Sequence, residues 1–258
     1  MCRLLAVVTR SSEPIRDALG GDLHAFRCLS REHSDGWGMS VHGVDGIATT
    51  RGLDAAFASE AFERASGVVG RAAIIHLRRA TGDLAVNLQN SHPFTQAGMA
   101  FAHNGYYLPF DAIRHLVPPH LAGLASGTTD SELYFLRILA RIEAGDRIES
   151  AILGAAADIK REAREFASLN CLLLTADGLY AYADENPDAD IRIENGDDFF
   201  RLMYREEQDR IVISSTGYEQ PAGRWKQVPF GSVLRIGLAS MSVAMVDRDE
   251  RIPRHACR

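Results

Sequence analysis

The sequence has few cysteines and no long hydrophobic run. Its four cysteines, Cys2, Cys28, Cys171 and Cys257, show neither the close, even spacing of a disulfide scaffold nor a C-x-x-C metal pattern. We therefore expect reduced thiols, no metal site and a cytoplasmic protein. No stretch approaches the roughly 18 apolar residues that cross a bilayer. The apolar start at Leu4 to Val8 is too short for the core of a signal peptide.

The chain also lacks a basic stripe, a linker and an internal repeat. Its 258 residues carry a formal net charge of −6, with acidic and basic side chains interspersed. Binding along a nucleic-acid backbone is therefore not expected. Proline and glycine are scattered, and 46% of the residues are hydrophobic, which is enough for a sizeable core. We predict one globular domain over residues 1–258.

Predicted strands flank a central pair of helices. Strands are expected at 3–9, 36–42, 47–50, 72–77, 99–102, 169–175, 179–183, 199–205, 210–214, 232–236 and 241–246, and helices at 54–65, 110–116, 130–144 and 148–166. Because strands and helices do not alternate regularly, the order favours an α+β layered fold over a doubly wound parallel sheet. The loop from Arg79 to Phe94 is long for a compact domain, and such loops are often functional.

Cys2 directly follows the initiator methionine. Removal of Met1, which is usual before a small residue, would place a thiol and a free α-amine on one residue. An α-amine with a pKa of roughly 7.7 to 8.0 is partly unprotonated near neutral pH and can assist loss of a thiol proton whose pKa is about 8.5. Cys2 is thus a candidate nucleophile that carries its own base. The simpler interpretation is that Cys2 begins a buried strand.

Four further segments contain chemically useful residues: Ser34–Met39 (SDGWGM), His76–Thr81 (HLRRAT), Ala102–Gly105 (AHNG) and Gly127–Glu132 (GTTDSE). Each has an ordinary explanation. Asn104-Gly105 is a common turn dipeptide, and Thr129-x-x-Glu132 is a capping box for a helix that begins at Asp130. An arginine at a strand end is more often a solvated charge than a ligand clamp.

Together with Cys2, and in this order, these segments resemble the class II glutamine amidotransferases, N-terminal nucleophile hydrolases whose mature chains begin with Cys. The match is to the short, stand-alone bacterial branch, with Met-Cys-x-Leu-Leu, Asp-Gly-Trp-Gly, Asn…His-Pro-Phe at Asn90–Phe94, His-Asn-Gly and Thr-Asp-Ser-Glu. The resemblance implies a four-layer αββα sandwich forming a single type-2 amidotransferase domain. It also implies release of ammonia from glutamine without a metal or an organic cofactor.

The resemblance implies a catalytic role for three residues. Cys2 would attack the γ-carboxamide carbon of glutamine and form a γ-glutamyl thioester. The side-chain amide of Asn104 and the backbone N–H of Gly105 would stabilise the oxyanion, with glycine permitting an unusual backbone path. Gly36 and Trp37 are expected to shape the nucleophile pocket.

Substrate recognition is the second implied function. Arg78 would bind the α-carboxylate and Thr81 would add a hydroxyl, since the motif spacing selects Arg78 over Arg79 and neighbouring strand residues face opposite ways. Asp130 would bind the α-ammonium as an anion stabilised by the helix macrodipole. One departure is that Gly82-Asp83 stands where the large synthases have His-Gly.

Three histidines occur in or beside these segments. His76, His92 and His103 lack the spacing of zinc ligands, and His103 is expected to be packed or hydrogen bonded rather than metal-bound.

Two alternative functions stay open on this evidence. One is a γ-glutamyl hydrolase acting on a modified substrate, as in the related enzyme of ergothioneine biosynthesis, whose N-terminal machinery would look alike. The other is a catalytically inactive glutamine-binding protein. For the amidotransferase itself, the residues after Asp130 complete the sandwich, so we expect either a separate ammonia-accepting partner or a free-standing hydrolase.

Overall fold

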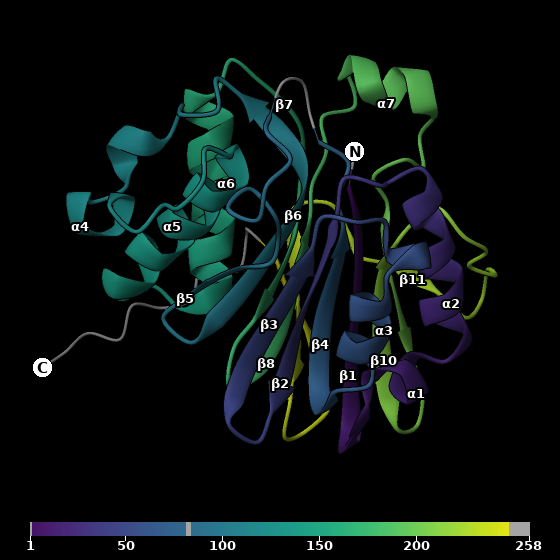
Figure 1. Ribbon diagram of the computed structural model, residues 1–258. Helices are drawn as coiled ribbons and strands as arrows, with labels where there is room; N and C mark the ends of the chain where they lie inside the picture. Colours follow the sequence, from purple (N-terminus) through teal and green to yellow (C-terminus); the bar gives the residue numbers. More distant parts are fainter. Residues whose placement is uncertain (1, 81–83, 248–258) are drawn as a thin grey trace, which may run out of the picture.

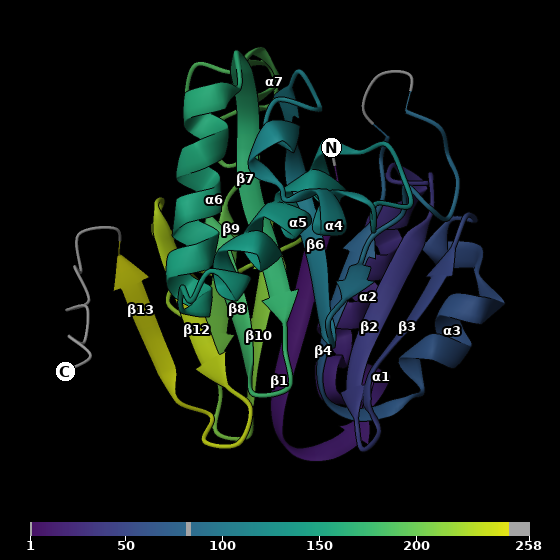
Figure 2. The same cartoon turned by 90° about the vertical axis from the view of Figure 1, so that its left-hand side faces the viewer.

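Two antiparallel β-sheets lie face to face, with helices on both outer faces (Figures 1 and 2). The computed structural model describes residues 2–80 and 84–247. The α+β class and the four-layer αββα arrangement predicted from the sequence are confirmed. Among the described residues, none of the helices has both the length and the apolar character needed to cross a bilayer.

The first sheet has β1 and β4 near its centre. Its strands, in spatial order, are β11 (Lys226–Gln227), β9 (Leu202–Glu206), β10 (Arg210–Ser215), β1 (Arg3–Pro14), β4 (Val69–Leu77), β2 (Trp37–Gly43) and β3 (Gly46–Gly52). The register of β1 against β4 places Arg3 opposite Leu77. The start of β1 therefore lies beside the end of β4, which brings Cys2 next to the segment containing Arg78.

The second sheet places β6 and β7 opposite β1 and β4. Its strands, in spatial order, are β13 (Val243–Asp247), β12 (Ser232–Gly237), β8 (Gly178–Ala183), β7 (Glu165–Leu174), β6 (Met99–Leu108) and β5 (Phe94–Gln96). In this sheet Asn104 of β6 is paired with Asn170 of β7.

Small and branched apolar residues fill the space between the sheets. They include Leu4, Ala6 and Val8 of β1, Ala72 and Ile74 of β4, Ala100 and Ala102 of β6, and Leu172 and Leu174 of β7. Successive side chains of a strand point to opposite faces. By this alternation Cys2, His76 and Asn104 also face the space between the sheets, at the end where β1 begins.

Helices bury the outer face of each sheet. The first sheet is covered by α1 (Ile15–Leu19), α2 (Gly21–Cys28) and α3 (Glu60–Ser66), and the second by α5 (Asp130–Glu143), α6 (Ile148–Glu162) and the short α4 (Pro119–Ala122). The helix α7 (Asp190–Asn195) lies over the end of the sandwich at which β1 begins (Figure 1). Single 3₁₀ turns occur at Leu29–Arg31, Ala56–Ala58 and Arg114–Leu116.

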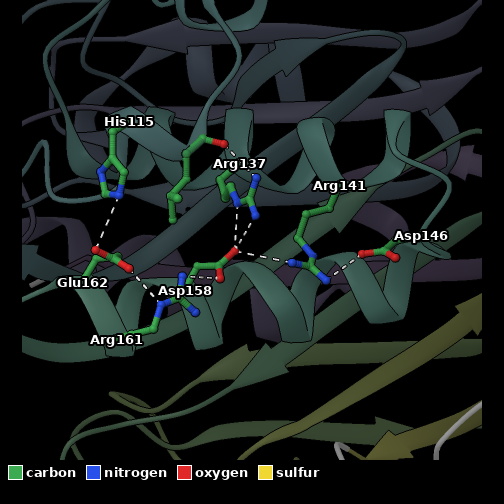
Figure 3. Close-up of polar contacts among 8 residues, drawn as sticks. His115, Arg137, Arg141, Asp146, Asp158, Arg161 and Glu162 are labelled. Atoms are coloured by element: carbon green, nitrogen blue, oxygen red, sulfur yellow. Dashed lines mark hydrogen bonds and ion pairs between the residues drawn. The ribbon is translucent and has the colours of Figure 1, made fainter.

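A buried carboxylate fixes α5 against α6 (Figure 3). Asp158 of α6 lies 2.7 Å from Nη2 of Arg137 and 3.4 Å from Nη1 of Arg141, both of α5, and it also pairs with Arg161. Burial raises the pKa of Asp158, but the hydrogen bonds from Arg137 and Arg161 outweigh it and the net shift is downward. Because α5 begins at Asp130, this network also holds the helix start that faces Cys2.

Two predicted helices differ from the observed ones in their limits. The helix predicted at 54–65 begins only at Glu60, because Ser59 Oγ accepts a hydrogen bond from Phe62 N and caps the helix there. The helix predicted at 148–166 ends at Glu162, and Glu165 already pairs with Leu108 in the sheet. The segment predicted as a helix at 110–116 forms only a 3₁₀ turn.

The sequence reading also missed α1, α2 and α7. The first two are short and are separated by Gly20, whose φ of 53° lets the chain turn between them. The glycine pair Gly20-Gly21 interrupts the helical pattern, so neither short helix was predicted from the sequence.

Gly38 and Gly43 offer a matched test of packing within β2. A Cβ at Gly38 would overlap the carbonyl oxygen of His92, whereas a Cβ at Gly43 would lie an ordinary 3.5 Å from Val69 O. We expect Gly38→Ala to lower the free energy of unfolding by about 1–3 kcal/mol, the usual range for overpacking. Gly43→Ala should leave it unchanged or raise it slightly. Urea denaturation measures both, and equal midpoints would contradict the close approach at Gly38.

Candidate active site

A small cleft opens at the end of the sandwich where β1 begins and β4 ends. It is lined by residues from β1, β6, the start of α5 and the loop after β4: Cys2, Arg78, Arg79, Ala80, Leu84, Asn90, His92, His103, Gly105, Thr129, Asp130 and Ser131. The cleft thus brings together Cys2, Arg78, Gly105 and Asp130, which the sequence singled out in separate segments. Thr81 lies outside the described residues.

Cys2 is nearly buried and firmly held. Its relative exposure is 9%, and its thiol donates to the carbonyl oxygen of Arg79 at 3.6 Å. Leu4 N donates to Ser215 Oγ at 3.0 Å, and the Arg3 guanidinium donates to the Cys2 carbonyl at 3.5 Å. Burial raises the pKa of the Cys2 thiol, and the positive charge of Arg78 only partly opposes this. A thiol in this position needs a base to become a nucleophile.

The backbone around Arg78 is positioned by the Asp-Gly-Trp-Gly segment. Arg78 N donates to Gly36 O at 2.8 Å, Asp35 N donates to Arg78 O at 3.1 Å, and Asp35 Oδ2 accepts from Ala80 N at 2.8 Å. Asp35 therefore fixes both sides of the turn that follows β4.

The two neighbouring arginines differ in their surroundings. Arg78 is 3% exposed, its Nη2 donates to Ala85 O at 3.0 Å, and its buried Nη1 has no hydrogen-bond partner among the described residues. Arg79 is exposed. A buried guanidinium nitrogen left without an acceptor fits binding of an anion.

Trp37 does not shape the nucleophile pocket, contrary to the sequence-based expectation. It packs with Phe62 on the outer face of the first sheet, and its Nε1 donates to Asp54 Oδ1 at 3.0 Å. Strand alternation explains the difference, because Trp37 lies on the face of its sheet opposite to that of Cys2.

Asn104 and Asn170 are cross-strand neighbours with opposite hydrogen-bonding states. Both are fully buried. The Asn170 amide donates to Phe200 O and accepts from Asp184 N, so both of its polar atoms are used. Neither amide atom of Asn104 has a partner among the described residues. Since buried polar groups in folded proteins are nearly always paired, Asn104 is the one that points to a ligand or a reaction intermediate.

Gly105 is a glycine because of space rather than backbone conformation. A Cβ at this position would overlap the carbonyl oxygen of Ser168 on β7. Its φ does not lie in the left-handed region, so the unusual backbone path expected from the sequence is not what requires glycine here.

Asp130 is buried rather than freely ionised. Its exposure is 3%, and burial raises its pKa to about 7, although hydrogen bonds from the backbone N–H groups of Tyr107 and Ser131 lower it. The Tyr107 N–H lies 3.1 Å from Asp130 Oδ2. Desolvation of the charged form therefore opposes the helix macrodipole, which was expected to favour ionisation of this carboxyl group.

The capping box at the start of α5 forms only in part. Thr129 Oγ1 accepts from Glu132 N at 3.2 Å, as predicted. The Glu132 carboxylate instead accepts from Ser126 N and Gly127 N at 2.9 and 2.8 Å. Glu132 thus shapes the loop before the helix.

Asn90 joins the loop after β4 to the start of α5. Its Oδ1 accepts from Thr128 N at 2.9 Å and its Nδ2 donates to Ala85 O at 3.2 Å. Ala85 O also accepts from Arg78, so a single carbonyl links the segments that present Arg78 and Asp130. The sequence reading noted Asn90 in a motif but assigned it no role.

Three buried histidines lie behind the cleft. The ring centroids of His76 and His92 are 4.2 Å apart. His103 is hydrogen bonded to Ser131 Oγ and to Ser168 O, which agrees with the packed, hydrogen-bonded role predicted for it. Burial lowers the pKa of His76 to about 3 and that of His103 to about 4. All three are neutral at pH 7. Within residues 2–80 and 84–247 no group of three or more His, Cys, Asp or Glu side chains is arranged to hold a metal ion.

A larger cavity, of about 440 Å³, lies between α6 and strands β8, β12 and β13. It shares no residue with the Cys2 cleft. Its polar groups bond to one another: Tyr182 Oη donates to Asp184 Oδ2 at 2.5 Å, and Ser232 donates to Asp247. The unpaired buried atoms of Arg78 and Asn104 therefore favour the Cys2 cleft as the functional site despite its smaller size.

Solved structures with the same fold include several amidotransferase proteins. The glutamine aminotransferase class-II domain protein of Silicibacter pomeroyi has a TM-score of 0.68 at 18% identity, covering 95% of this chain and 99% of that one. The predicted glutamine amidotransferase of Pseudomonas aeruginosa PA01 has a TM-score of 0.57 at 18% identity, covering 94% and 99%. The glutamine phosphoribosylpyrophosphate amidotransferase of B. subtilis has a TM-score of 0.63 at 18% identity, covering 97% of this chain but 50% of that one.

At these identities the structures establish the fold, that of the N-terminal nucleophile amidotransferases. A search of curated proteins finds no significant match. The sequence model of the family described as class-II glutamine amidotransferases matches residues 1–253. Because this match spans nearly the whole chain, the protein belongs to the class II glutamine amidotransferases.

Proposed function

We propose that the protein releases ammonia from glutamine through a γ-glutamyl thioester on Cys2. One observation carries this proposal. A buried thiol, a guanidinium nitrogen without an acceptor and a buried carboxyl group meet in one cleft, and the unpaired Asn104 amide lies beside it. These are the groups that amide hydrolysis of a free α-amino acid requires.

The catalytic step uses Cys2 and the segment around Asn104. The Cys2 thiolate attacks the γ-carboxamide carbon, and negative charge develops on the carbonyl oxygen. The Asn104 amide and the Gly105 N–H stabilise that charge in a site from which most water is excluded. The base passes the proton taken from the thiol to the amide nitrogen, and collapse of the intermediate then expels ammonia. Water hydrolyses the thioester to glutamate and free Cys2.

Recognition of the amino-acid end falls to Arg78 and Asp130. The Nη1 of Arg78 donates to the α-carboxylate, and Asp130 accepts from the α-ammonium. Thr81 is proposed to add a hydroxyl to the carboxylate. Asn90 keeps the two charged groups at a fixed separation, because it bonds to the loops that present them.

The α-amine of Cys2 is the proposed base. Burial raises the thiol pKa, so at neutral pH the thiol keeps its proton unless a neighbouring group removes it. Removal of Met1 would supply an unprotonated amine on the same residue.

We also propose a single type-2 domain that acts without a cofactor on glutamine or a γ-glutamyl compound. Either a separate partner accepts the ammonia, or the protein is a free-standing hydrolase. The cytoplasm is the proposed compartment, because the nucleophile must remain a reduced thiol and Cys2, Cys28 and Cys171 are unpaired.

Replacing Cys2 tests the central claim. Cys2→Ala should abolish glutamine hydrolysis without unfolding the protein, because the change removes only one small side-chain atom at the start of β1. Measurement of released ammonia, with circular dichroism on the same sample, checks both parts. Intact mass should show that active protein begins at Cys2. Full activity in a preparation that retains Met1 would contradict the α-amine as base.

Asn104→Ala should affect catalysis rather than folding. Loss of one oxyanion donor typically lowers kcat by about 10² to 10³, and within residues 2–80 and 84–247 the Asn104 amide has no hydrogen-bond partner to lose. Asn170→Ala is the matched control, since it breaks bonds to Phe200 and Asp184 and should lower stability. Steady-state kinetics and urea denaturation of both variants separate the two roles. A similar loss of stability in both, with kcat unchanged, would remove Asn104 from the mechanism.

Asp130→Asn should weaken binding of substrates that carry an α-ammonium. The variant keeps the size and the position in the helix but loses the charge. KM for glutamine should therefore rise far more than KM for an analogue that lacks the α-amine. Equal changes for the two substrates would mean that Asp130 serves only the helix start.

A further inference from the structure

A chain of hydrogen bonds leads from the Asp130 carboxyl group into the interior. Asp130 Oδ1 lies 3.3 Å from Ser131 Oγ, Ser131 Oγ lies 2.9 Å from His103 Nδ1, and His103 Nε2 lies 3.0 Å from the Ser168 carbonyl oxygen. All four residues are at most 4% exposed. Water therefore competes little, and each contact has to join a donor to an acceptor.

The far end of the chain fixes the direction of its hydrogen bonds. The Ser168 carbonyl can only accept, so His103 Nε2 must carry a hydrogen. A neutral imidazole has one N–H, which leaves Nδ1 as an acceptor for the Ser131 hydroxyl. The Ser131 oxygen then presents only lone pairs to Asp130. The contact between Asp130 and Ser131 is consequently a hydrogen bond only when Asp130 Oδ1 itself carries a proton.

One proton therefore completes the chain, and two positions can hold it. If His103 held it, both ring nitrogens would donate and Ser131 would donate to an Asp130 carboxylate. Burial lowers the pKa of His103 to about 4 and raises that of Asp130 to about 7. Asp130 is accordingly where the proton resides near neutral pH. A chain that holds no proton has two oxygens facing each other without a hydrogen between them.

The other titratable and charged groups around this chain come from β1, β4, β6, α5 and the loop after β4: Cys2, His76, Arg78, His92, Tyr107 and Tyr134. Burial raises the pKa of the thiol and of both phenols and lowers that of both imidazoles. Arg78 stays charged throughout. Between about pH 5 and 8, Asp130 changes its charge, and so does a free α-amine on residue 2, whose pKa of roughly 7.7 to 8.0 lies at the upper end of that range.

We propose that Ser131 and His103 are positioning residues that hold one proton on Asp130 in the empty site, and that binding of an α-ammonium group releases this proton. The inference rests on the proposed function. The ammonium brings its own N–H donors to Asp130, the O–H bond of the carboxyl group breaks, and the proton leaves to solvent. Ser131 goes on donating to His103, so the interior part of the chain is unchanged.

The sign of the pH dependence follows from this exchange. Below the pKa of Asp130, binding of the ammonium must first remove a proton. KM for glutamine should therefore be level above about pH 8 and rise about tenfold per pH unit below about pH 6. A substrate analogue without the α-amine should not show the rise.

Calorimetry of the Cys2→Ala protein measures the released proton without turnover. Glutamine is titrated in buffers of different ionisation enthalpy, and the slope of the observed enthalpy gives the number of protons released. We expect roughly three quarters of a proton at about pH 6.5 and about a tenth at about pH 8. The same titration of Cys2→Ala/Asp130→Asn, which keeps the α-amine of residue 2, should lack the release seen at about pH 6.5, at weaker affinity, and it measures any share of the α-amine at about pH 8.

Ser131→Ala and Ser131→Thr distinguish positioning from general structural support. Without the hydroxyl, protonated Asp130 loses its acceptor, so the midpoint of the KM profile should move down by about half a unit to one unit. Ser131→Thr keeps a hydroxyl and should keep the wild-type midpoint. A merely structural role would change KM by the same factor at every pH.

The outcomes separate the two proposals. Glutamine binding without proton release at about pH 6.5, or a wild-type midpoint in Ser131→Ala, would overturn the shared proton and leave the proposed function standing. Failure of glutamine to bind at all would overturn the proposed function, and the coupling with it. If Ser131→Ala does not fold, proton release by the Cys2→Ala protein still decides the question.

Discussion

The antiparallel pairing of β1 with β4 is the constraint on which the site depends. Because Arg3 lies opposite Leu77, the chain that carries Cys2 meets the chain that carries Arg78 at one edge of the sheet. A shift of one residue would turn Cys2 to the outer face, under the helices. Both faces of β1 and β4 are buried, so such a shift would exchange residues packed between the sheets with residues packed under the helices. Packing on both faces of the sheet thus positions Cys2.

Burial gives the site its electrostatic character. The thiol of Cys2 and the carboxyl group of Asp130 both have raised pKa values because burial disfavours their charged forms. The buried atoms of Asn104 and Arg78 that have no partner in the part of the chain that the structure describes incur a similar desolvation cost. A ligand that supplies an oxyanion, a carboxylate and an ammonium would satisfy all of these groups together. Strong preference for a complete amino-acid substrate is the expected result, because a truncated one leaves buried groups unpaired.

Many of the strands and several of the site residues could be predicted from the sequence, and the features that were missed have physical causes. Short apolar runs located β1, β4, β7 and β8, which are buried on both faces along most of their length. Trp37 was misplaced because the motif that contains it was treated as a unit, whereas adjacent strand residues face opposite layers. The raised pKa of Asp130 could not be predicted, because helix position is visible in a sequence and desolvation is not. Asn90 and Ser131 act through partners far along the chain or through hydrogen-bond direction, which no local pattern reveals.

The residues proposed to bind the amino-acid end of the substrate, Arg78 and Asp130, are held by loops, whereas Cys2 and Asn104 are held by paired strands. Cys2 and Asn104 belong to paired strands or their immediate ends, whose positions are fixed by two ladders and the core between them. Arg78 follows a strand end and Asp130 begins a helix, and the side chain of Asn90 links the loops that precede or follow them. Changes in these loops can therefore alter which substrate is held while leaving the proposed thioester chemistry in place. This division would allow one nucleophile arrangement to serve several γ-glutamyl substrates.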